Sequence, residues 1–443
     1  MAQLVALEPR KPQNSKGVFD AHHPPSQELM DDCVHCGFCL PTCPTYLLWH
    51  EEMDSPRGRI YLMRMGAEGG VAEMDGTFVD HFDQCLGCMA CMTACPSGVQ
   101  YSPLIEATRA QIERNYKRPF WERVYRRLIF EIFPHPRRLR LALLPLWFYQ
   151  KSGLRWLLRK SGLLRLLPEQ LRSMEALLPE LSLSALYKAT PVQVAARGTK
   201  RRRVGVLLGC VQRVMFSDAN LATIRVLSKL GCEVVVPPEQ GCCGALMTHT
   251  GREAEAQAAA RKLIETFERA DVDTVVINAA GCGSNMKDYP NLFRDNAEWL
   301  ERARKFSGKC RDVTEVIAEL GLEGAEFEPI NMIVAYHDPC HLLHAQGVQR
   351  QPRELLNAIP GLKLKELPES QICCGSAGVY NLVEPAPAKQ LADRKAQNII
   401  RSGAEALVSA NPGCLLQISS ALQRAERPMP AMHIVEMLDR AMK

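Results

Sequence analysis

Two segments near the start of the chain each carry four cysteines in the same spacing. Both follow the pattern C-x2-C-x2-C-x3-C-P; the first run has Cys33, Cys36, Cys39 and Cys43, and the second run has Cys85, Cys88, Cys91 and Cys95. Thiolates are the soft ligands that iron in iron–sulfur clusters prefers. This spacing is typical of [4Fe–4S] binding, in which the fourth cysteine of each run ligates the other cluster. Structural zinc also uses C-x2-C pairs, but two identical runs that both end in proline favour iron–sulfur clusters.

The crossed pattern divides these eight cysteines between two clusters of the ferredoxin type. We predict one [4Fe–4S] cluster on Cys33, Cys36, Cys39 and Cys95, and a second on Cys85, Cys88, Cys91 and Cys43. Between the runs, Ser55 and Pro56 predict the start of a helix. Arg57 and Arg59 follow on this helix, where they either face the charge of a cluster or partner, or lie on a solvated face. The chain is therefore expected to carry electrons.

Eight further cysteines form a repeat in the second half of the chain. Each copy has one cysteine, then a Cys-Cys-Gly (CCG) sequence, then a fourth cysteine; the first copy has Cys210, Cys242, Cys243 and Cys282, and the second has Cys340, Cys373, Cys374 and Cys414. Strand patterns at 204–209 and 331–339 end at the first cysteine of each copy, and helix and strand patterns alternate after it. This alternation predicts two α/β units with parallel sheets, which bind ligands at the carboxyl ends of their strands.

Three interpretations of the CCG cysteines stay open. They bind one or two further iron–sulfur clusters, they form a zinc site or a redox dithiol, or they are structural cysteines without a metal. The adjacent Cys242 and Cys243 fit a single tetrahedral zinc ion poorly. Three histidines flank Cys340 and can act as substitute ligands, as hydrogen-bond partners of ligands or as structural residues: His337, His341 and His344.

Composition places the chain among soluble globular proteins of a reducing compartment. It has 443 residues, 47% of them hydrophobic and 23% charged, so it is long enough for several domains. Its 18 cysteines are too few for a disulfide scaffold and stand in ligand spacings. We expect no secretory signal. The longest apolar run, residues 141–149, is too short to span a bilayer, so a cytoplasmic location is expected.

The charge of the chain is concentrated in one segment. The net charge is +5, yet residues 117–172 contain fourteen Lys or Arg against three Glu. Leucine and tryptophan alternate there with the basic residues, and prolines, Pro145 among them, are expected to divide the segment into short helices. Such helices can lie on an anionic membrane, dock on an acidic partner or form a plain linker. The sequence has no nucleic-acid-binding module.

These patterns predict an α+β chain of five segments. It has an extended N-terminal arm (1–30), a helical ferredoxin-type domain with two clusters (31–110), a basic helical connector (111–199), and two CCG cysteine-rich α/β units with parallel sheets (200–320 and 321–443). We call the last two the first unit and the second unit. Neither a dinucleotide fingerprint nor a Walker loop or nucleophile elbow occurs. No catalytic residue is therefore predicted, and the chain alone should lack a substrate-oxidising site.

The arrangement resembles the iron–sulfur subunits of bacterial glycolate oxidases, notably at 54–60 and 337–342. The resemblance implies an oxidoreductase complex in which FAD-binding dehydrogenase subunits oxidise glycolate or D-lactate. Electrons then pass through the [4Fe–4S] clusters of this chain to a quinone or another respiratory acceptor. It leaves open a peripheral contact with the cytoplasmic face of the inner membrane. Subunits of anaerobic glycerol-3-phosphate or lactate dehydrogenases share this layout and are the alternative.

The two units also resemble the CCG domain of heterodisulfide reductase subunits. In the fullest form of that motif a fifth cysteine follows the last one in C-x2-C spacing, but Asn285 and Gln417 occupy those positions here. This leaves four thiols in each unit. A thiol–disulfide enzyme acting through the CCG cysteines, and a non-enzymatic scaffold, are the remaining alternatives.

Overall fold

The N-terminal domain consists of short helices packed around one apolar core. The computed structural model describes residues 17–443; residues 1–16 of the expected arm lie outside it. The helices are α1 (Gln27–Asp31), η1 (Leu40–Thr42), α2 (Pro44–Trp49), η2 (Glu52–Asp54), α3 (Pro56–Glu68), α4 (Gly76–Asp83), α5 (Ala90–Ala94) and α6 (Tyr101–Asn115). Ser55 caps α3 by accepting from the backbone N–H of Gly58, and Pro56 opens the helix, as the sequence predicts. The core includes Met63 and Phe82.

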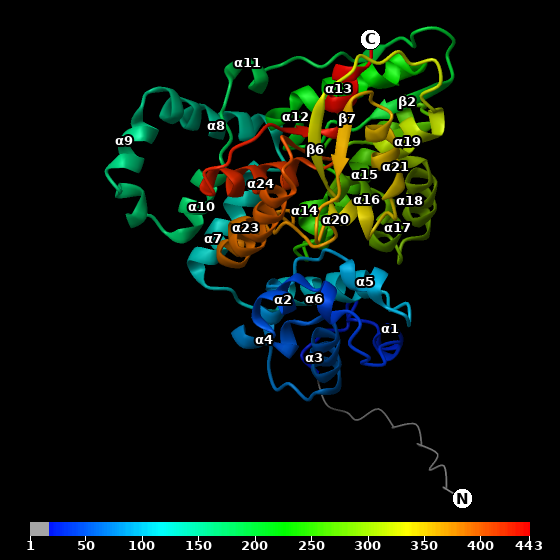
Figure 1. Ribbon diagram of the computed structural model, residues 1–443. Helices are drawn as coiled ribbons and strands as arrows, with labels where there is room; N and C mark the ends of the chain where they lie inside the picture. The colour runs from blue at the N-terminus through cyan, green and yellow to red at the C-terminus, as the bar shows by residue number, and fades with distance from the viewer. Residues whose placement is uncertain (1–16) are drawn as a thin grey trace, which may run out of the picture.

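The connector runs from this domain up one side of the molecule. It comprises α7 (Phe120–Ile132), α8 (Pro136–Lys151), α9 (Leu154–Lys160), η3 (Leu163–Leu166), α10 (Glu169–Leu177) and α11 (Leu183–Leu186). Helix α9 projects farthest from the body (Figure 1). The expected break at Pro145 is wrong, because α8 continues through it. Leu139 and Leu143 anchor this helix in a buried cluster, and that packing outweighs the hydrogen bond that proline removes. Among residues 17–443, no helix is long and apolar enough to cross a membrane.

The first unit is built on a five-stranded sheet in the order β1-β3-β2-β4-β5. Its strands are β1 (Gln193–Val194), β2 (Arg202–Val206), β3 (Cys232–Val235), β4 (Thr274–Ile277) and β5 (Cys310–Asp312). Its helices are α12 (Gln212–Met215), α13 (Ser217–Lys229), α14 (Ala245–Thr248), α15 (Glu253–Ala270), α16 (Ala280–Lys287), α17 (Tyr289–Leu292), α18 (Ala297–Lys309) and α19 (Val313–Leu320). All pairs are parallel except β1 with β3. The antiparallel edge strand β1 comes from the end of the expected connector.

The second unit repeats this plan with a four-stranded parallel sheet in the order β7-β6-β8-β9. Its strands are β6 (Met332–His337), β7 (Leu362–Lys365), β8 (Ala406–Ser409) and β9 (Ala431–His433). Its helices are α20 (Cys340–Leu343), α21 (Arg350–Asn357), α22 (Tyr380–Val383), α23 (Pro385–Ser402), α24 (Pro412–Arg424) and α25 (Ile434–Ala441). In both sheets the first strand of the repeat lies between the second and the third. The predicted α+β class and the parallel sheets are confirmed.

The two units pack together, and the N-terminal domain lies beneath both of them (Figure 1). One buried apolar cluster contains side chains of both sheets, such as Val204 and Val334. Helices α14, α16 and α20 lie on the side that faces the N-terminal domain (Figure 1). Gly251 of the first unit lies so close to helix α6 that a Cβ at this position would be 2.2 Å from the carbonyl oxygen of Arg109. The carboxyl-terminal side of both sheets, where the cysteines lie, is thus turned toward the ferredoxin-type domain.

Candidate iron–sulfur and cysteine sites

Three cysteines of the second run and Cys43 surround one small hollow in the N-terminal domain. Its lining includes Cys43, Cys85, Cys88, Cys91, Arg59 and Tyr101. The empty volume is about 300 Å³, part of it open to solvent. Gly87 and Met89 have φ of +61° and +62°, a left-handed conformation that turns the loop between α4 and α5 around the hollow. The fold therefore brings the last cysteine of the first run to the first three of the second, the set that the crossed pattern predicts.

The other predicted set lies closer to the surface. Cys36 is exposed, whereas Cys33, Cys39 and Cys95 are half-buried. Cys33 and Cys95 pack against the same apolar core that contains Cys85. Burial raises the pKa of Cys39 to about 11, and the neighbouring thiols Cys43 and Cys33 act in the same direction. A cluster held by this set would be the one that an external partner can approach.

Arg59 faces the hollow and not the solvent. It is 1% exposed, and its guanidinium donates to the carbonyl oxygen of Asp54 at 2.5 Å and to Thr45 Oγ1 at 3.1 Å. Its Nη2 also lies 3.3 Å from the Asp54 carboxylate. Arg57 behaves differently, because it pairs with Glu52 at 2.6 Å at the edge of the domain. Of the two arginines that the sequence singled out, only Arg59 lines the hollow with the cysteines.

Positive charge also reaches Cys85 from helix α6. Arg109 donates to the carbonyl oxygens of Phe82 and Cys85. Burial on its own raises the pKa of Cys85, but Arg59 and Arg109 outweigh it and hold the pKa of this thiol below its ordinary value. The same two charges would stabilise a negatively charged cluster at this place.

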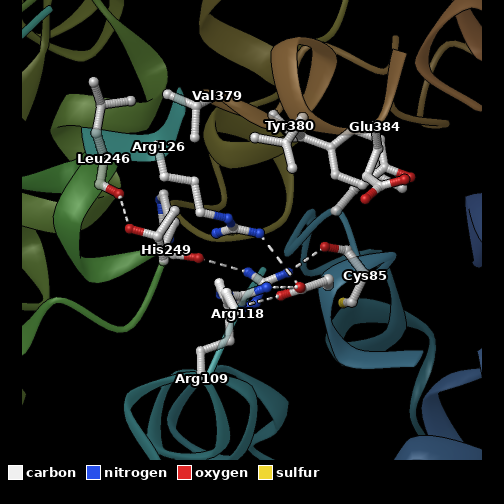
Figure 2. Close-up of a pocket in the computed structure, with 15 residues that line it drawn as sticks. Cys85, Arg109, Arg118, Arg126, Leu246, His249, Val379, Tyr380 and Glu384 are labelled. Atoms are coloured by element: carbon white, nitrogen blue, oxygen red, sulfur yellow. Dashed lines mark hydrogen bonds and ion pairs between the residues drawn. The ribbon is translucent and has the colours of Figure 1, made fainter. Parts of the chain in front are cut away.

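A larger pocket lies where the N-terminal domain, the connector and both units meet (Figure 2). Its empty volume is about 580 Å³, and its lining includes Asp83, Cys85, Arg109, Arg118, Arg126, Leu246, His249, Tyr380 and Glu384. Arg118 and Arg126 pair with Asp83 at 2.5 and 3.3 Å, and Arg109 donates to the carbonyl oxygen of His249 at 2.9 Å. Protein oxygens thus hold all three guanidinium groups of this pocket. It does not present a free arginine to a substrate carboxylate.

In the first unit, the structure brings the four CCG cysteines into one chain of sulfur contacts. Cys210 and Cys242 lie 3.6 Å apart between their sulfurs. Cys243 is in hydrogen-bonding contact with both Cys242 and Cys282. These residues come from the loop after β2, the loop before α14 and the first turn of α16. The position three residues before Cys210 is Leu207, which packs in the same apolar cluster as Cys243.

In the second unit, the four cysteines form the same chain of contacts, and a histidine joins them. Cys340 and Cys373 lie 3.9 Å apart between their sulfurs, and Cys374 contacts both Cys373 and Cys414. The ligand atoms of His337, Cys374 and Cys414 all lie within 4.8 Å of one another. Burial, and then the charge of Lys395, lowers the pKa of His337, so the imidazole is neutral at physiological pH.

The positions of the missing fifth cysteines have structural roles. Asn285 donates to the carbonyl oxygen of Cys243 at 2.8 Å. Gln417 donates to the carbonyl oxygen of Ala388 at 3.0 Å and accepts from Asn381 at 2.9 Å. Asn285 therefore holds the CCG loop of the first unit, whereas Gln417 joins helix α24 to helices α22 and α23.

The other two histidines near Cys340 join the domains. His341 lies 3.0 Å from the carbonyl oxygen of Gly87 and 2.7 Å from Ser284 of the first unit. His344 lies 2.8 Å from the hydroxyl of Thr93 and 3.1 Å from the carbonyl oxygen of Gln371. Each has a partner on both ring nitrogens, so neither is free to bind a metal in this arrangement.

Sequence reasoning missed Lys395, and it named His337 as a possible ligand without separating it from His341 and His344. Lys395 on α23 is 2% exposed and donates to the carbonyl oxygens of Glu369 and Ser370. Its burial beside Cys373 and Cys374 depends on the loop at 366–372, which composition does not reveal. The sequence signal for His337 was its place opposite Leu207 when the two copies are aligned on their first cysteines.

Comparisons with known proteins match every part of this architecture. A 4Fe-4S dicluster domain matches residues 29–99, the linker region of the glycolate oxidase iron-sulfur subunit matches 121–178, and the cysteine-rich CCG domain matches 204–287 and 334–419. The dicluster and CCG matches support iron–sulfur clusters as the cofactors of the chain.

Curated relatives extend over nearly the whole chain. A probable glycolate oxidase iron-sulfur subunit of Bacillus subtilis is 41% identical over 93% of this chain and 95% of the relative. The glycolate oxidase iron-sulfur subunit of Escherichia coli is 35% identical over 94% and 95%. Lactate utilization protein A of an Exiguobacterium strain is 35% identical, over 54% of this chain and 98% of its own length. The resemblance that the two cysteine runs and the CCG units indicated is therefore confirmed: the chain belongs to the family of glycolate oxidase iron–sulfur subunits, which are electron-transfer subunits of an oxidoreductase complex.

Proposed function

We propose that this chain takes electrons from FAD on a partner dehydrogenase subunit that oxidises glycolate, and passes them to a quinone or another respiratory acceptor. The observation that carries the proposal is the hollow formed by Cys43 and three cysteines of the second run. A flavin accepts an electron pair from an organic substrate and releases it singly, and iron–sulfur clusters accept single electrons. The paired arginines of the interdomain pocket agree with a substrate site on another subunit.

We assign the clusters by the crossed pattern. Cys33, Cys36, Cys39 and Cys95 would hold the first cluster, and Cys85, Cys88, Cys91 and Cys43 the second. The shared wall of the hollow supports the second set. The exposed position of Cys36 makes the first cluster the natural entry point from the flavin subunit. Arg59 and Arg109 would stabilise the second cluster by their charge.

The four thiols of each CCG unit are further candidate ligands. In the first unit the contacts among Cys210, Cys242, Cys243 and Cys282 would suffice for one four-thiolate site. In the second unit the set is Cys340, Cys373, Cys374 and Cys414. The division of the chain at 31–110, 111–199, 200–320 and 321–443 is part of this proposal, as is a cytoplasmic location.

The outer part of the connector is a candidate membrane-contact surface. Trp156, Leu157 and Leu166 are more than half exposed there. Basic side chains alternate with them, and Lys160 lies 4.8 Å from the centre of the Trp156 ring. Exposed apolar and basic side chains on one short arm suit the anionic cytoplasmic face of the inner membrane. We propose a peripheral contact at this place.

The proposed function is tested by anaerobic purification of the chain with its natural partners. The complex is assayed for dye-linked oxidation of glycolate, D-lactate and glycerol-3-phosphate. We expect glycolate oxidation by a co-purifying flavoprotein. Cys91→Ser should abolish electron delivery to a quinone while a dye that accepts directly from flavin is still reduced; Cys310→Ser, a buried cysteine outside the motifs, should change neither. Activity with glycerol-3-phosphate alone, or a chain that purifies without flavin, would contradict the proposal.

The membrane contact is tested separately by sedimentation with vesicles that contain anionic lipid. The intact complex should bind them at low salt and release at high salt, because surface charge attraction is screened. Replacing Trp156 and Leu157 with serine should abolish the binding without changing dye-linked activity. Vesicle binding that changes with neither salt nor these replacements would exclude this surface as the membrane contact.

A further inference from the structure

We propose that the second unit holds an iron–sulfur centre to which His337 supplies an imidazole ligand, together with Cys340, Cys373, Cys374 and Cys414. The first unit has no counterpart of this ligand. The proposal goes beyond the proposed function and depends on it only in that the chain is loaded with iron and sulfide.

The first observation is the unsatisfied state of His337. Its side chain is 0% exposed, and both ring nitrogens lack a hydrogen-bond partner among the described residues. Buried imidazoles are normally hydrogen-bonded, because an unpaired polar group loses its water without compensation. The ligand atoms of His337, Cys374 and Cys414 lie within 4.8 Å of one another. A metal at this place would satisfy one nitrogen of the ring.

The number and type of donors favour iron and sulfide over a single zinc ion. Cys340 and Cys373, 3.9 Å apart, continue the thiol set through the contact between Cys373 and Cys374. With His337 this gives five soft or borderline donors, whereas a structural zinc ion binds four. This is one donor more than a single tetrahedral ion binds, and iron–sulfur clusters are polynuclear groups that thiolates and imidazole hold together.

Two polar groups of the second unit suit an anionic centre. Lys395 is 2% exposed, and its charge acts on Cys374 and Cys373. Asn411 donates to the sulfur of Cys414 at 3.2 Å. Buried cations and hydrogen bonds to sulfur both stabilise the negative charge of a cluster. On the matching helix of the first unit, the buried Leu263 occupies the position equivalent to Lys395, and the neighbouring Lys262 is exposed.

The site also lies against the second ferredoxin-type ligand set. Cys88 belongs to the same buried apolar cluster as Cys340 and Cys373. Among the described residues, the apolar cluster around Cys243 and Cys282 of the first unit contains no cysteine of the two runs. A centre in the second unit could therefore exchange one electron directly with the cluster at Cys88, so that one centre is oxidised as the other is reduced.

The test compares three full-length proteins, purified anaerobically and loaded with iron and sulfide. They are the wild type, His337→Ala and His337→Cys, the last of which keeps a soft ligand if the alanine variant is unstable. His344→Ala is the matched control, because His344 lies seven residues along the same segment but has partners on both nitrogens. Iron and acid-labile sulfide are counted per chain. Pulsed EPR then measures the hyperfine coupling to imidazole nitrogen in protein labelled with 15N-histidine.

We expect the wild type and His344→Ala to show a nitrogen coupling that both His337 variants lose. His337→Ala should also lose the iron of one centre, and His337→Cys should keep it with a lower reduction potential, because a thiolate replaces a neutral imidazole. Nitrogen coupling that survives in the His337 variants, unchanged iron in His337→Ala, or zinc in place of iron would overturn the proposal. None of these readouts uses glycolate, so failure of the proposed function would be seen separately.

Discussion

The two cysteine-rich units share the order of their four parallel strands, and their cysteine spacings differ by only one residue, yet the surroundings of the cysteines differ. In the first unit, Leu207 and Leu263 pack in one apolar cluster with Cys243. In the second, His337 occupies the position of Leu207, and Lys395, at the position of Leu263, is buried beside the thiols. The backbone plan therefore does not decide what each unit can bind. The side chains that surround the four sulfurs do.

The contacts with the ferredoxin-type domain differ in the same way. The second unit meets it through Cys340 and Cys373, which share a buried cluster with Cys88. The first unit meets it through ion pairs, such as Arg252 with Glu113 at 3.7 Å and Glu253 with Arg114 at 3.8 Å. Electron transfer needs short distances between centres, whereas docking needs only complementary surfaces. We infer that the first unit chiefly supports the domain and that the second extends the electron path.

The largest expected difference between the units concerns their CCG glycines. Gly244 and Gly375 have φ of +83° and +86°, so alanine is strained at both. A Cβ at Gly375 would lie 2.5 Å from the carbonyl oxygen of Ala388, but a Cβ at Gly244 would lie 3.2 Å from that of Ala256. We expect Gly244→Ala to lower the free energy of unfolding by about 1–2 kcal/mol, and Gly375→Ala by roughly 3 kcal/mol because overpacking is added.

Guanidinium unfolding followed by tryptophan fluorescence measures this difference. The two variants should have similar slopes and different midpoints. Equal losses of stability would mean that the loop at Gly375 can move away from α23. The steric difference between the two glycine sites would then be refuted.

The next difference concerns the buried lysine. Lys395→Gln keeps an N–H donor for the carbonyl oxygens of Glu369 and Ser370 but removes the positive charge. Without that charge the reduced, more negative state of a centre on Cys373 and Cys374 is less stable. Its reduction potential should fall in an EPR-monitored redox titration. Lys262→Gln is the control, and a shift of the same size in both variants would refute the special role of the second site.

The smallest effect is a pH dependence of the contact with the first unit. Burial and the Asp288 carboxylate raise the pKa of Glu106, with Arg109 and Arg294 opposing them; burial likewise raises the pKa of Asp288 to about 6. The nearby His249 is neutral, because burial lowers its pKa. A carboxyl with a raised pKa holds its proton more tightly in the folded state. The two carboxyl groups therefore add to the free energy of unfolding at low pH. This contribution is lost as pH rises through their raised pKa values.

Hydrogen exchange of α6 and α16 should become faster as pH rises from about 6 to about 8, after correction for the intrinsic rate. Glu106→Gln should remove this trend. Protection at Gly87, where His341 joins the second unit, should stay constant, because burial lowers the pKa of His341 and keeps it neutral in this range. A trend at both contacts would show a general loosening of the fold.

The sequence predicted the architecture because its signals are local. Cysteine spacing, the apolar strands at 204–209 and 331–339, and the Ser55–Pro56 helix start each involve neighbouring residues. The roles of the three histidines could not be ranked in this way. The partners of His341 and His344 are Gly87, Ser284 and Thr93, which lie far away in the sequence. The helix through Pro145 was missed for the same reason, since distant packing holds it.

The most direct test of the central claim is the magnetic interaction between the cluster at Cys88 and a centre in the second unit. The EPR power saturation of the reduced clusters would be measured in the intact protein, in Cys374→Ser and in Cys243→Ser. A paramagnetic centre in the second unit should speed relaxation of the cluster at Cys88. We predict that Cys374→Ser removes this enhancement and Cys243→Ser leaves it intact. Enhancement that persists in Cys374→Ser, or disappears only in Cys243→Ser, would contradict the account.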